Sequence, residues 1–137
     1  MKLEHIGIAV ANLDESEALL HRLLGRSSYK RETVAAQSVT TSFFTAGDAD
    51  SQAKLELVAP EGDTGPIQKY LDKRGPGIHH LAFEVEDIVA EMRRLKDDGF
   101  ELLSELPQPG ADNKLVCFLH PRSTGGVLVE LCQSRPA

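Results

Sequence analysis

The 137-residue chain has a shortage of positive charge, few cysteines and no long apolar run. Its 15 lysines and arginines are outnumbered by 21 acidic residues, and the net charge of −6 argues against broad electrostatic binding of nucleic acid. No apolar segment approaches the ~20 residues that cross a bilayer, so we expect no membrane partner. An anionic small ligand remains compatible with this composition if a few basic residues lie at its site.

Only two cysteines, Cys117 and Cys132, are present, and both fall in strand-like segments. The first residues, "MKLEHIGIAV", contain one lysine and neither a long apolar core nor a cleavage pattern, so we expect no signal peptide. Without secretion, we expect the two thiols to be reduced core residues and the protein to be cytoplasmic.

The first sixty residues predict a strand, a helix and three more strands. Residues 2–10 alternate in polarity and are rich in β-branched side chains, which is typical of a strand. Asp14, with Glu17 three positions later, predicts a capped helix start, and Gly25 predicts its end. The expected apolar stripe of this helix consists of Ala18, Leu19, Leu20, Leu23 and Leu24. Further strand-like runs follow near 27–35, 38–46 and 53–59.

Residues 61–77 are rich in glycine, proline and charge, and they predict a linker. A short helix is expected after Pro66, with an apolar side made by Ile67, Tyr70 and Leu71. This linker separates two segments that have the same pattern.

Residues 78–86 begin the second strand–helix–strands pattern. Asp87 is placed to cap the helix and Gly99 to end it. The side chains that this helix should bury are Ile88, Met92 and Leu95. The strand-like runs that follow lie near 101–106, 114–120 and 126–133.

The second pattern repeats the first with polar side chains in matching places. His5 falls on His80 with a shift of 75 (5 to 80), and Glu56 falls on Glu130 with a shift of 74 (56 to 130). We therefore predict an α+β fold in which two tandem βαβββ modules form a pseudo-twofold, curved mixed sheet. The predicted single domain is 1–137, with modules at about 1–60 and 78–135.

Strand alternation places these two histidines and two glutamates away from the faces that pack on the helices. A polar residue on the second face of an antiparallel sheet is ordinarily just solvated. A matching His and Glu in both modules instead favours a shared function. If the modules pack about a pseudo-twofold axis, the four side chains converge on the concave face as suitable ligands for a divalent metal with open water positions.

The remaining histidines next to this pattern have other expected roles. His79 lies on the opposite strand face from His80, so we expect it to support the core rather than bind metal. His120, in "FLHPRSTGG", either lines a ligand pocket or serves a turn.

Two modules of this kind resemble the vicinal oxygen chelate superfamily, which includes glyoxalases, bleomycin-resistance proteins and dioxygenases. Within it, the stretches "LEHIGIAVANLDES", "GIHHLAFEV" and "HPRSTGGVLVEL" are similar to the methylmalonyl-CoA epimerase family, over about residues 3–133. The linker "GPIQKYLDKRG" also fits that family.

The resemblance implies a metal-dependent epimerase that interconverts (R)- and (S)-methylmalonyl-CoA through a metal-stabilised enolate. It also implies a homodimer with an acyl-CoA substrate, and a divalent ion, Co²⁺ by resemblance, with Mn²⁺, Zn²⁺, Ni²⁺ or Mg²⁺ as alternatives. The implied metal ligands are His5, Glu56, His80 and Glu130.

Inversion at the α-carbon needs an acid/base group on each side of the reacting plane. Glu130 is our first candidate and Glu56 the second. Some bacterial epimerases carry a catalytic Glu in the stretch that matches "AAQSVTTSF", where this chain has Thr41, and some carry Gln in place of Glu56. Because a firmly ligated carboxylate is a poor base, a bound water or a residue near Thr41 could replace either glutamate.

Several polar residues are candidate contacts for the anionic substrate. The turn from Ser123 to Gly126 contains glycines that allow a close backbone approach, and basic side chains lie beside it. An exposed basic residue or an ordinary hairpin turn is an equally good interpretation. The candidate substrate contacts are Gln37, Lys114, His120, Arg122 and Ser123.

Three other functions fit the same scaffold. A glyoxalase I-like lactoylglutathione lyase would use the same four ligands, but the linker and "HPRSTGG" argue against it. A metal-free small-molecule binding protein need not keep all four ligands. An extradiol dioxygenase would need only three ligands and redox-active iron.

Overall fold

The computed structural model describes residues 1–49 and 52–136. The chain divides into two compact units. The N-terminal unit is His5–His79, and the C-terminal unit is Met1–Glu4 with His80–Ala137. No helix in the described part of the chain is long and apolar enough to cross a membrane.

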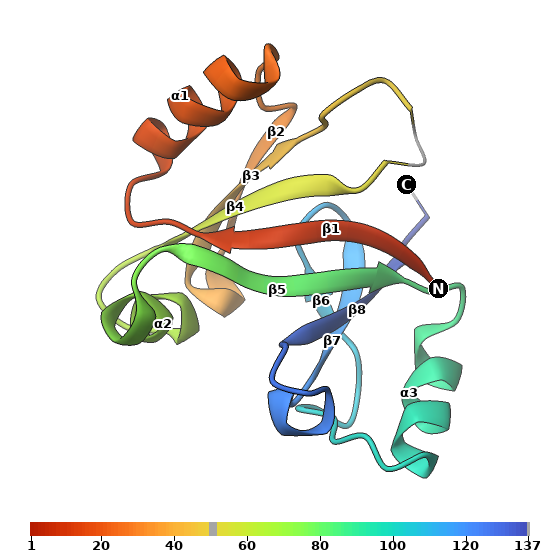
Figure 1. The fold of residues 1–137 in the computed structure, drawn as a ribbon. Helices are drawn as coiled ribbons and strands as arrows, with labels where there is room; N and C mark the ends of the chain where they lie inside the picture. Colours follow the sequence, from red (N-terminus) through yellow and green to blue (C-terminus); the bar gives the residue numbers. More distant parts are fainter. Residues whose placement is uncertain (50–51, 137) are drawn as a thin grey trace. The chain divides into compact units, whose positions relative to one another are not determined.

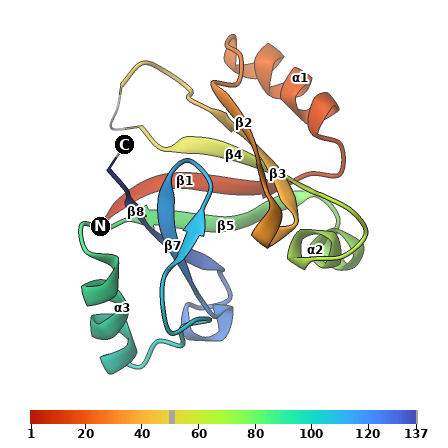
Figure 2. The same ribbon diagram turned by 180° about the vertical axis from the view of Figure 1, so that it is seen from behind.

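Four strands and two helices make up the N-terminal unit (Figure 1). The strand order is β2-β3-β4-β1, with β1 and β4 parallel and the other neighbours antiparallel. The strands β2 and β3 form a hairpin around a short 3₁₀ turn, η1 (Figure 2). The elements are β1 (Lys2–Ala9), α1 (Leu13–Leu24), β2 (Lys30–Val34), η1 (Ala35–Gln37), β3 (Val39–Phe44), β4 (Lys54–Pro60) and α2 (Pro66–Arg74).

The C-terminal unit has the same design. Its strand order is β5-β8-β7-β6, with β5 and β8 parallel and the other neighbours antiparallel. The elements are β5 (Gly77–Glu84), α3 (Ile88–Asp97), β6 (Gln108–Gly110), β7 (Lys114–Leu119), η2 (Pro121–Ser123) and β8 (Val129–Ser134). In both units the first strand therefore pairs in parallel with the last, which confirms the repeated βαβββ pattern and the α+β class.

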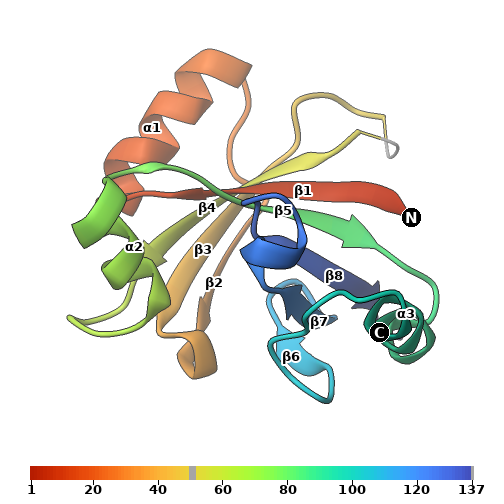
Figure 3. The same cartoon turned by 60° about the horizontal axis from the view of Figure 1, so that its bottom comes forward.

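In each unit one sheet face packs against a helix, α1 or α3. In the N-terminal unit, Leu20 of α1 packs with Val10, Phe44 and Leu57. The helix α2 lies beside β4 (Figure 3), and its Ile67 packs on the opposite face, against Ala9, Val39 and Val58. In the C-terminal unit, α3 packs on β7 and β8. The helix side chains that it buries there are Ile88, Met92 and Leu95, as predicted.

The predicted start of the first helix is wrong. Asn12, not Asp14, caps α1, because its side chain accepts a hydrogen bond from the backbone N–H of Glu15 at 3.0 Å. Asp14 and Glu17 instead bind Arg31 of β2. Glu17 also accepts a hydrogen bond from the buried hydroxyl of Ser42 at 2.7 Å, so the helix is tied to the sheet by these polar side chains.

The predicted apolar stripe of α1 is only partly correct. Leu20 is buried and Leu24 is packed against the core, together with Leu13. Leu19 and Leu23 are exposed at 55% and 72%, because the buried side runs from Leu13 through Leu20 to Leu24. Ala18 is exposed as well.

The strand predicted at residues 101–106 is absent from the described structure, where this segment makes one isolated bridge, between Leu102 and Leu119. The Ser104 hydroxyl donates to the Leu106 carbonyl at 2.8 Å, a local bond that competes with strand pairing. The edge strand β6 lies further on and ends at Gly110, where an added Cβ would lie 2.8 Å from Val116.

Asn12→Ala should lower the free energy of unfolding by about 1 kcal/mol, since the cap of α1 is lost. Asp14→Ala should cost less than about 0.5 kcal/mol, because it removes only an exposed ion pair with Arg31. Urea unfolding of both variants measures the difference. A larger loss for Asp14→Ala than for Asn12→Ala would restore Asp14 as the important residue of the helix start.

Candidate active site

A buried imidazole and a buried carboxylate pair in the N-terminal unit. His5 lies on β1 and Glu56 on β4, and their side chains approach to 3.4 Å between Nε2 and Oε1. The strand register places Gly7 opposite Glu56, so no side chain from that position obstructs the carboxylate. Phe43 of β3 packs edge-on against the His5 ring, with centroids 6.3 Å apart.

The C-terminal unit contains the matching pair. Nε2 of His80 on β5 lies 3.3 Å from Oε1 of Glu130 on β8. Here Ala82 is the small residue opposite the glutamate. Phe118 of β7 packs edge-on against His80, with centroids 6.0 Å apart. The repeat therefore extends from the sequence to the surroundings of each pair.

Burial separates these four residues from ordinary solvated side chains on an open sheet face. His5 and His80 are 4% and 5% exposed, and Glu56 and Glu130 are each 6% exposed. Burying a carboxylate is costly unless a partner compensates it. Each pair offers one imidazole nitrogen and one carboxylate oxygen, which are ligand types for hard or borderline divalent metals.

His79 has a different environment from His80. Its ring packs at a right angle to Tyr70 of α2, with centroids 4.9 Å apart. The Tyr70 hydroxyl donates to the backbone carbonyl of Ile78 at 2.7 Å. Tyr70 of α2 therefore contacts two neighbouring residues of β5. These contacts agree with the supporting role expected for His79.

Lys114 is the most buried of the predicted substrate contacts. The residue is 8% exposed, and its ammonium donates to the Ser134 hydroxyl at 2.8 Å. Ser134 in turn donates to Glu84 at 3.0 Å, and Lys2 lies 3.7 Å from the same carboxylate. This chain of contacts holds a positive charge inside the C-terminal unit.

His120, Arg122 and Ser123 lie together around η2, but they contact one another and Glu101. Arg122 donates to both oxygens of Glu101 at 2.6 Å, and this ion pair raises the pKa of Arg122 and lowers that of Glu101. The backbone N–H of Arg122 donates to His120 Nδ1, and Ser123 donates to the His120 carbonyl. An anionic ligand would have to compete with Glu101 for Arg122.

Gln37 and Thr41 lie on the β2–β3 hairpin. Gln37 ends η1, and the next residue, Ser38, has a left-handed backbone with φ of 55°. Thr41 is buried, and its hydroxyl donates to the backbone carbonyl of Glu32 at 3.3 Å. Glu32 lies directly opposite Thr41 in the register. Glu32 belongs to none of the motifs that predict the site, although the alternation within "KRETV" places it on the same strand face as Lys30.

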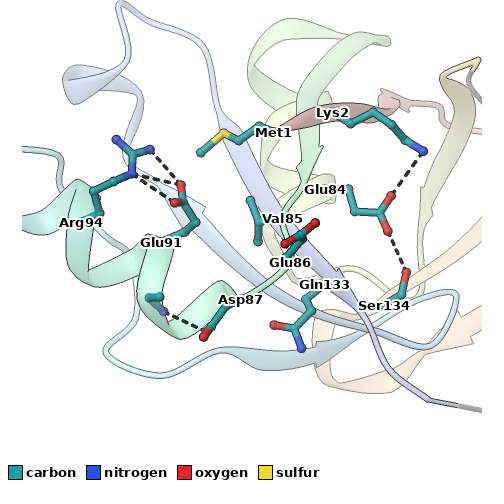
Figure 4. A pocket seen from close by; sticks show the side chains of 11 residues that line it. Met1, Lys2, Glu84, Val85, Glu86, Asp87, Glu91, Arg94, Gln133 and Ser134 are labelled. Carbon is teal, nitrogen blue, oxygen red and sulfur yellow. Dashed lines mark hydrogen bonds and ion pairs between the residues drawn. The ribbon is translucent and has the colours of Figure 1, made fainter.

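A cavity of about 980 Å³ lies in the C-terminal unit between β5, β8 and the start of α3 (Figure 4). Its wall is rich in acids, and the basic side chains are Lys2 and Arg94, which pair with Glu84 and Glu91. None of the predicted site residues lines this cavity. This excess of acidic side chains disfavours an anionic ligand, so the candidate active site is assigned to the His–Glu pairs.

The fold and the paired sites agree with a comparison to known families. The Glyoxalase/Bleomycin resistance protein/Dioxygenase superfamily matches residues 4–118, and the chain belongs to this superfamily.

Three relatives are similar over nearly the whole chain. The ethylmalonyl-CoA/methylmalonyl-CoA epimerase of Cereibacter sphaeroides is 40% identical, over 96% of this chain and 97% of that protein. The crystal structure of methylmalonyl-CoA epimerase from Mycobacterium tuberculosis is 38% identical, with a TM-score of 0.92 over 98% of this chain and 89% of that one. A Streptomyces coelicolor epimerase variant in complex with 2-nitronate-propionyl-CoA is 30% identical, with a TM-score of 0.94 over 99% of both chains.

Cys117 and Cys132 are buried free thiols, as predicted. Burial raises the pKa of both, and for Cys132 the neighbouring charges of Glu130 and Glu4 raise it further. Neither thiol is therefore poised to act as a thiolate metal ligand or nucleophile.

In the native protein both thiols should resist a disulfide reagent at pH 8, and both should react within minutes in denaturant.

Because their folded pKa values lie above the unfolded value of about 8.5, the protein should lose stability as the pH rises above that value, where only the unfolded thiols ionise. Timed labelling and urea unfolding at pH 7 and pH 9.5 measure both effects. Fast labelling of the native protein at pH 8 would contradict the burial of the thiols.

Proposed function

We propose that this protein is an epimerase that interconverts (R)- and (S)-methylmalonyl-CoA by removing and returning the α-proton. The observation that carries the proposal is one buried His–Glu pair in each repeated unit. It is supported by relatives named methylmalonyl-CoA epimerase at 30–40% identity over almost the entire chain.

The donor set fits a divalent metal. His5, Glu56 and His80 offer buried nitrogen and oxygen ligands, and Glu130 is paired with His80. We propose that all four hold one ion, Co²⁺ by family resemblance, with Mn²⁺, Zn²⁺, Ni²⁺ or Mg²⁺ as alternatives. When bound, such an ion acts as a Lewis acid that lowers the energy of negative charge developing on a carbonyl oxygen.

The side chains transfer the proton, shield the site from water and bind the substrate. Glu130 alternates between metal ligand and acid/base group, and it exchanges a proton with the α-carbon from one side. An acid/base group of the N-terminal unit works from the other side. Phe43 and Phe118 pack against the two histidines and shield them from water, which strengthens electrostatic interactions nearby. Lys114 supplies a buried positive charge for the anionic substrate.

Contacts to the CoA part are proposed for Gln37 and for the η2 segment with His120, Arg122 and Ser123. For Arg122 this requires exchange of its partner, from the Glu101 carboxylate to a phosphate of the substrate. The guanidinium is well suited to both, because it presents paired donors to two oxygens. We also propose a cytoplasmic homodimer that acts in propionate metabolism, on the basis of family resemblance.

The metal-loaded protein should exchange the α-proton of methylmalonyl-CoA for deuterium in D₂O and interconvert its two epimers. Proton NMR follows the exchange, and chromatography of the CoA-ester diastereomers follows the inversion. The matched control is the chelator-treated protein, which should lose both activities and recover them when a divalent ion is added.

The absence of exchange with every one of the five ions would rule out the proposed function. The hemithioacetal of methylglyoxal and glutathione serves as the comparison substrate. Turnover of that compound, without exchange of methylmalonyl-CoA, would support a glyoxalase I-like lyase instead.

His80→Ala should weaken metal binding by more than the roughly 10–100-fold that loss of an outer-shell partner costs. His79→Ala should leave metal affinity unchanged and should cost about 0.5–1.5 kcal/mol of stability, because it removes the ring contact with Tyr70. Calorimetric titration with Co²⁺ and thermal unfolding separate the two effects. If only His79→Ala loses metal, the assignment of strand faces is wrong.

A further inference from the structure

The sheet face of the N-terminal unit that lies away from α1 carries a second carboxylate besides that of Glu56. Glu32 on β2 lies opposite Thr41 on β3, and Thr41 lies opposite Val58 on β4. Residues directly opposite each other on neighbouring strands project to the same face, as do residues two apart on one strand. Glu32 therefore shares a face with Val58 and, two residues earlier on β4, with Glu56.

Among the described residues of the strands β1 to β4 from His5 on, these are the two carboxylates on this face. The other residues that the register places there are His5, Gly7, Ala9, Lys30, Val34, Val39, Thr41, Phe43, Lys54, Val58 and Pro60. A carboxylate acid/base group from this face is therefore either Glu32 or Glu56.

The surroundings of the two carboxylates favour Glu32 as the base. The Glu56 side chain is 8% exposed and held 3.4 Å from His5, in the arrangement expected of a metal ligand. The Glu32 side chain is 30% exposed and lies 3.3 Å from the ammonium of Lys30. A substrate can reach Glu32, and this carboxylate can accept a proton without first giving up a ligand role.

Strand pairing and a side-chain hydrogen bond hold the backbone around Glu32. The β2–β3 hairpin holds it in register across five paired positions (Figure 2). The Thr41 hydroxyl donates to the Glu32 backbone carbonyl at 3.3 Å, which ties β2 to β3 at this register position. Two strand spacings place β2 about 10 Å from β4, so Glu32 and Glu56 hold separate positions on this face.

We propose that Glu32 is the catalytic acid/base of the N-terminal unit and acts opposite Glu130. In one direction the Glu32 carboxylate accepts the α-proton, and the electron pair of the broken C–H bond moves into the thioester carbonyl to give an enolate. The carboxylic acid form of Glu130 then donates a proton to the opposite face of the α-carbon. The two groups have exchanged protonation states, and proton exchange with water restores them; the reverse reaction uses them in the opposite roles. The inference rests on the proposed function.

The decisive variant is Glu32→Gln, which keeps the shape of the side chain and removes the base. Epimerisation should fall by about 10²- to 10⁴-fold, the range typical of a lost acid/base group. In D₂O, one epimer should still exchange its α-proton without inversion, because Glu130 faces that proton, while exchange of the other epimer should be lost. Each purified diastereomer is followed by NMR and chromatography, with an enzyme-free sample to measure spontaneous epimerisation.

Two comparisons make the result specific. Glu61→Gln is the matched control. It removes a carboxylate that accepts a hydrogen bond from Thr40, and Thr40 lies on the opposite face of the hairpin from Glu32. This variant should epimerise the substrate at the wild-type rate. Glu32→Gln should bind Co²⁺ within about twofold of wild type by calorimetry, whereas Glu56→Ala should bind it more weakly, since outer-shell losses alone cost about 10–100-fold.

Epimerisation by Glu32→Gln at a rate near wild type would overturn the assignment and leave the proposed function standing. Loss of metal binding in this variant, or equal loss of exchange from both epimers, would show that Glu32 acts through structure and would also overturn it. No exchange by the wild-type protein would instead reject the proposed function itself.

Discussion

The parallel pairing of the first and last strands in each unit is the constraint on which the candidate site depends. It brings His5 beside Glu56 and His80 beside Glu130, residues that are separated by some fifty positions in the chain. Parallel neighbours cannot be joined by a tight turn, so the helix and the two intervening strands are needed to return the chain. The layers that bury the core therefore also set the spacing of the polar pairs.

The apolar face and the polar face of each unit have opposite effects on the stability of the fold. On the helix side, leucine, methionine and phenylalanine clusters contribute most of the stabilisation through burial. On the other side, buried imidazoles and carboxylates lower stability unless they are compensated. A bound divalent ion would offset this cost, because ligands that bind only the folded state stabilise it. The stabilisation from the hydrophobic layer thus offsets the destabilisation from the polar layer that carries the candidate active site.

The sequence alone predicted the repeat, the fold class and the strand faces, because alternation and the matching His and Glu positions are local signals. It missed features that depend on distant partners. Asp14 has a side chain that could cap α1, but it forms an ion pair with Arg31, and Asn12 caps the helix instead. Leu19 resembles a core residue until the position of the helix on the sheet is known. Glu32 becomes a candidate only when its pairing with Thr41 is known, and the sequence of one strand does not specify that register.

Each unit supplies half of the proposed ligand set, one imidazole and one carboxylate. A protein with a single such module would have to find a second copy of itself in solution to complete the set, and assembly would then depend on protein concentration. Joining the modules through the segment that contains α2 makes the encounter intramolecular, so that it no longer depends on protein concentration. The tandem arrangement also lets the two halves diverge, so that Thr41 and Glu32 of one module need no counterpart in the other.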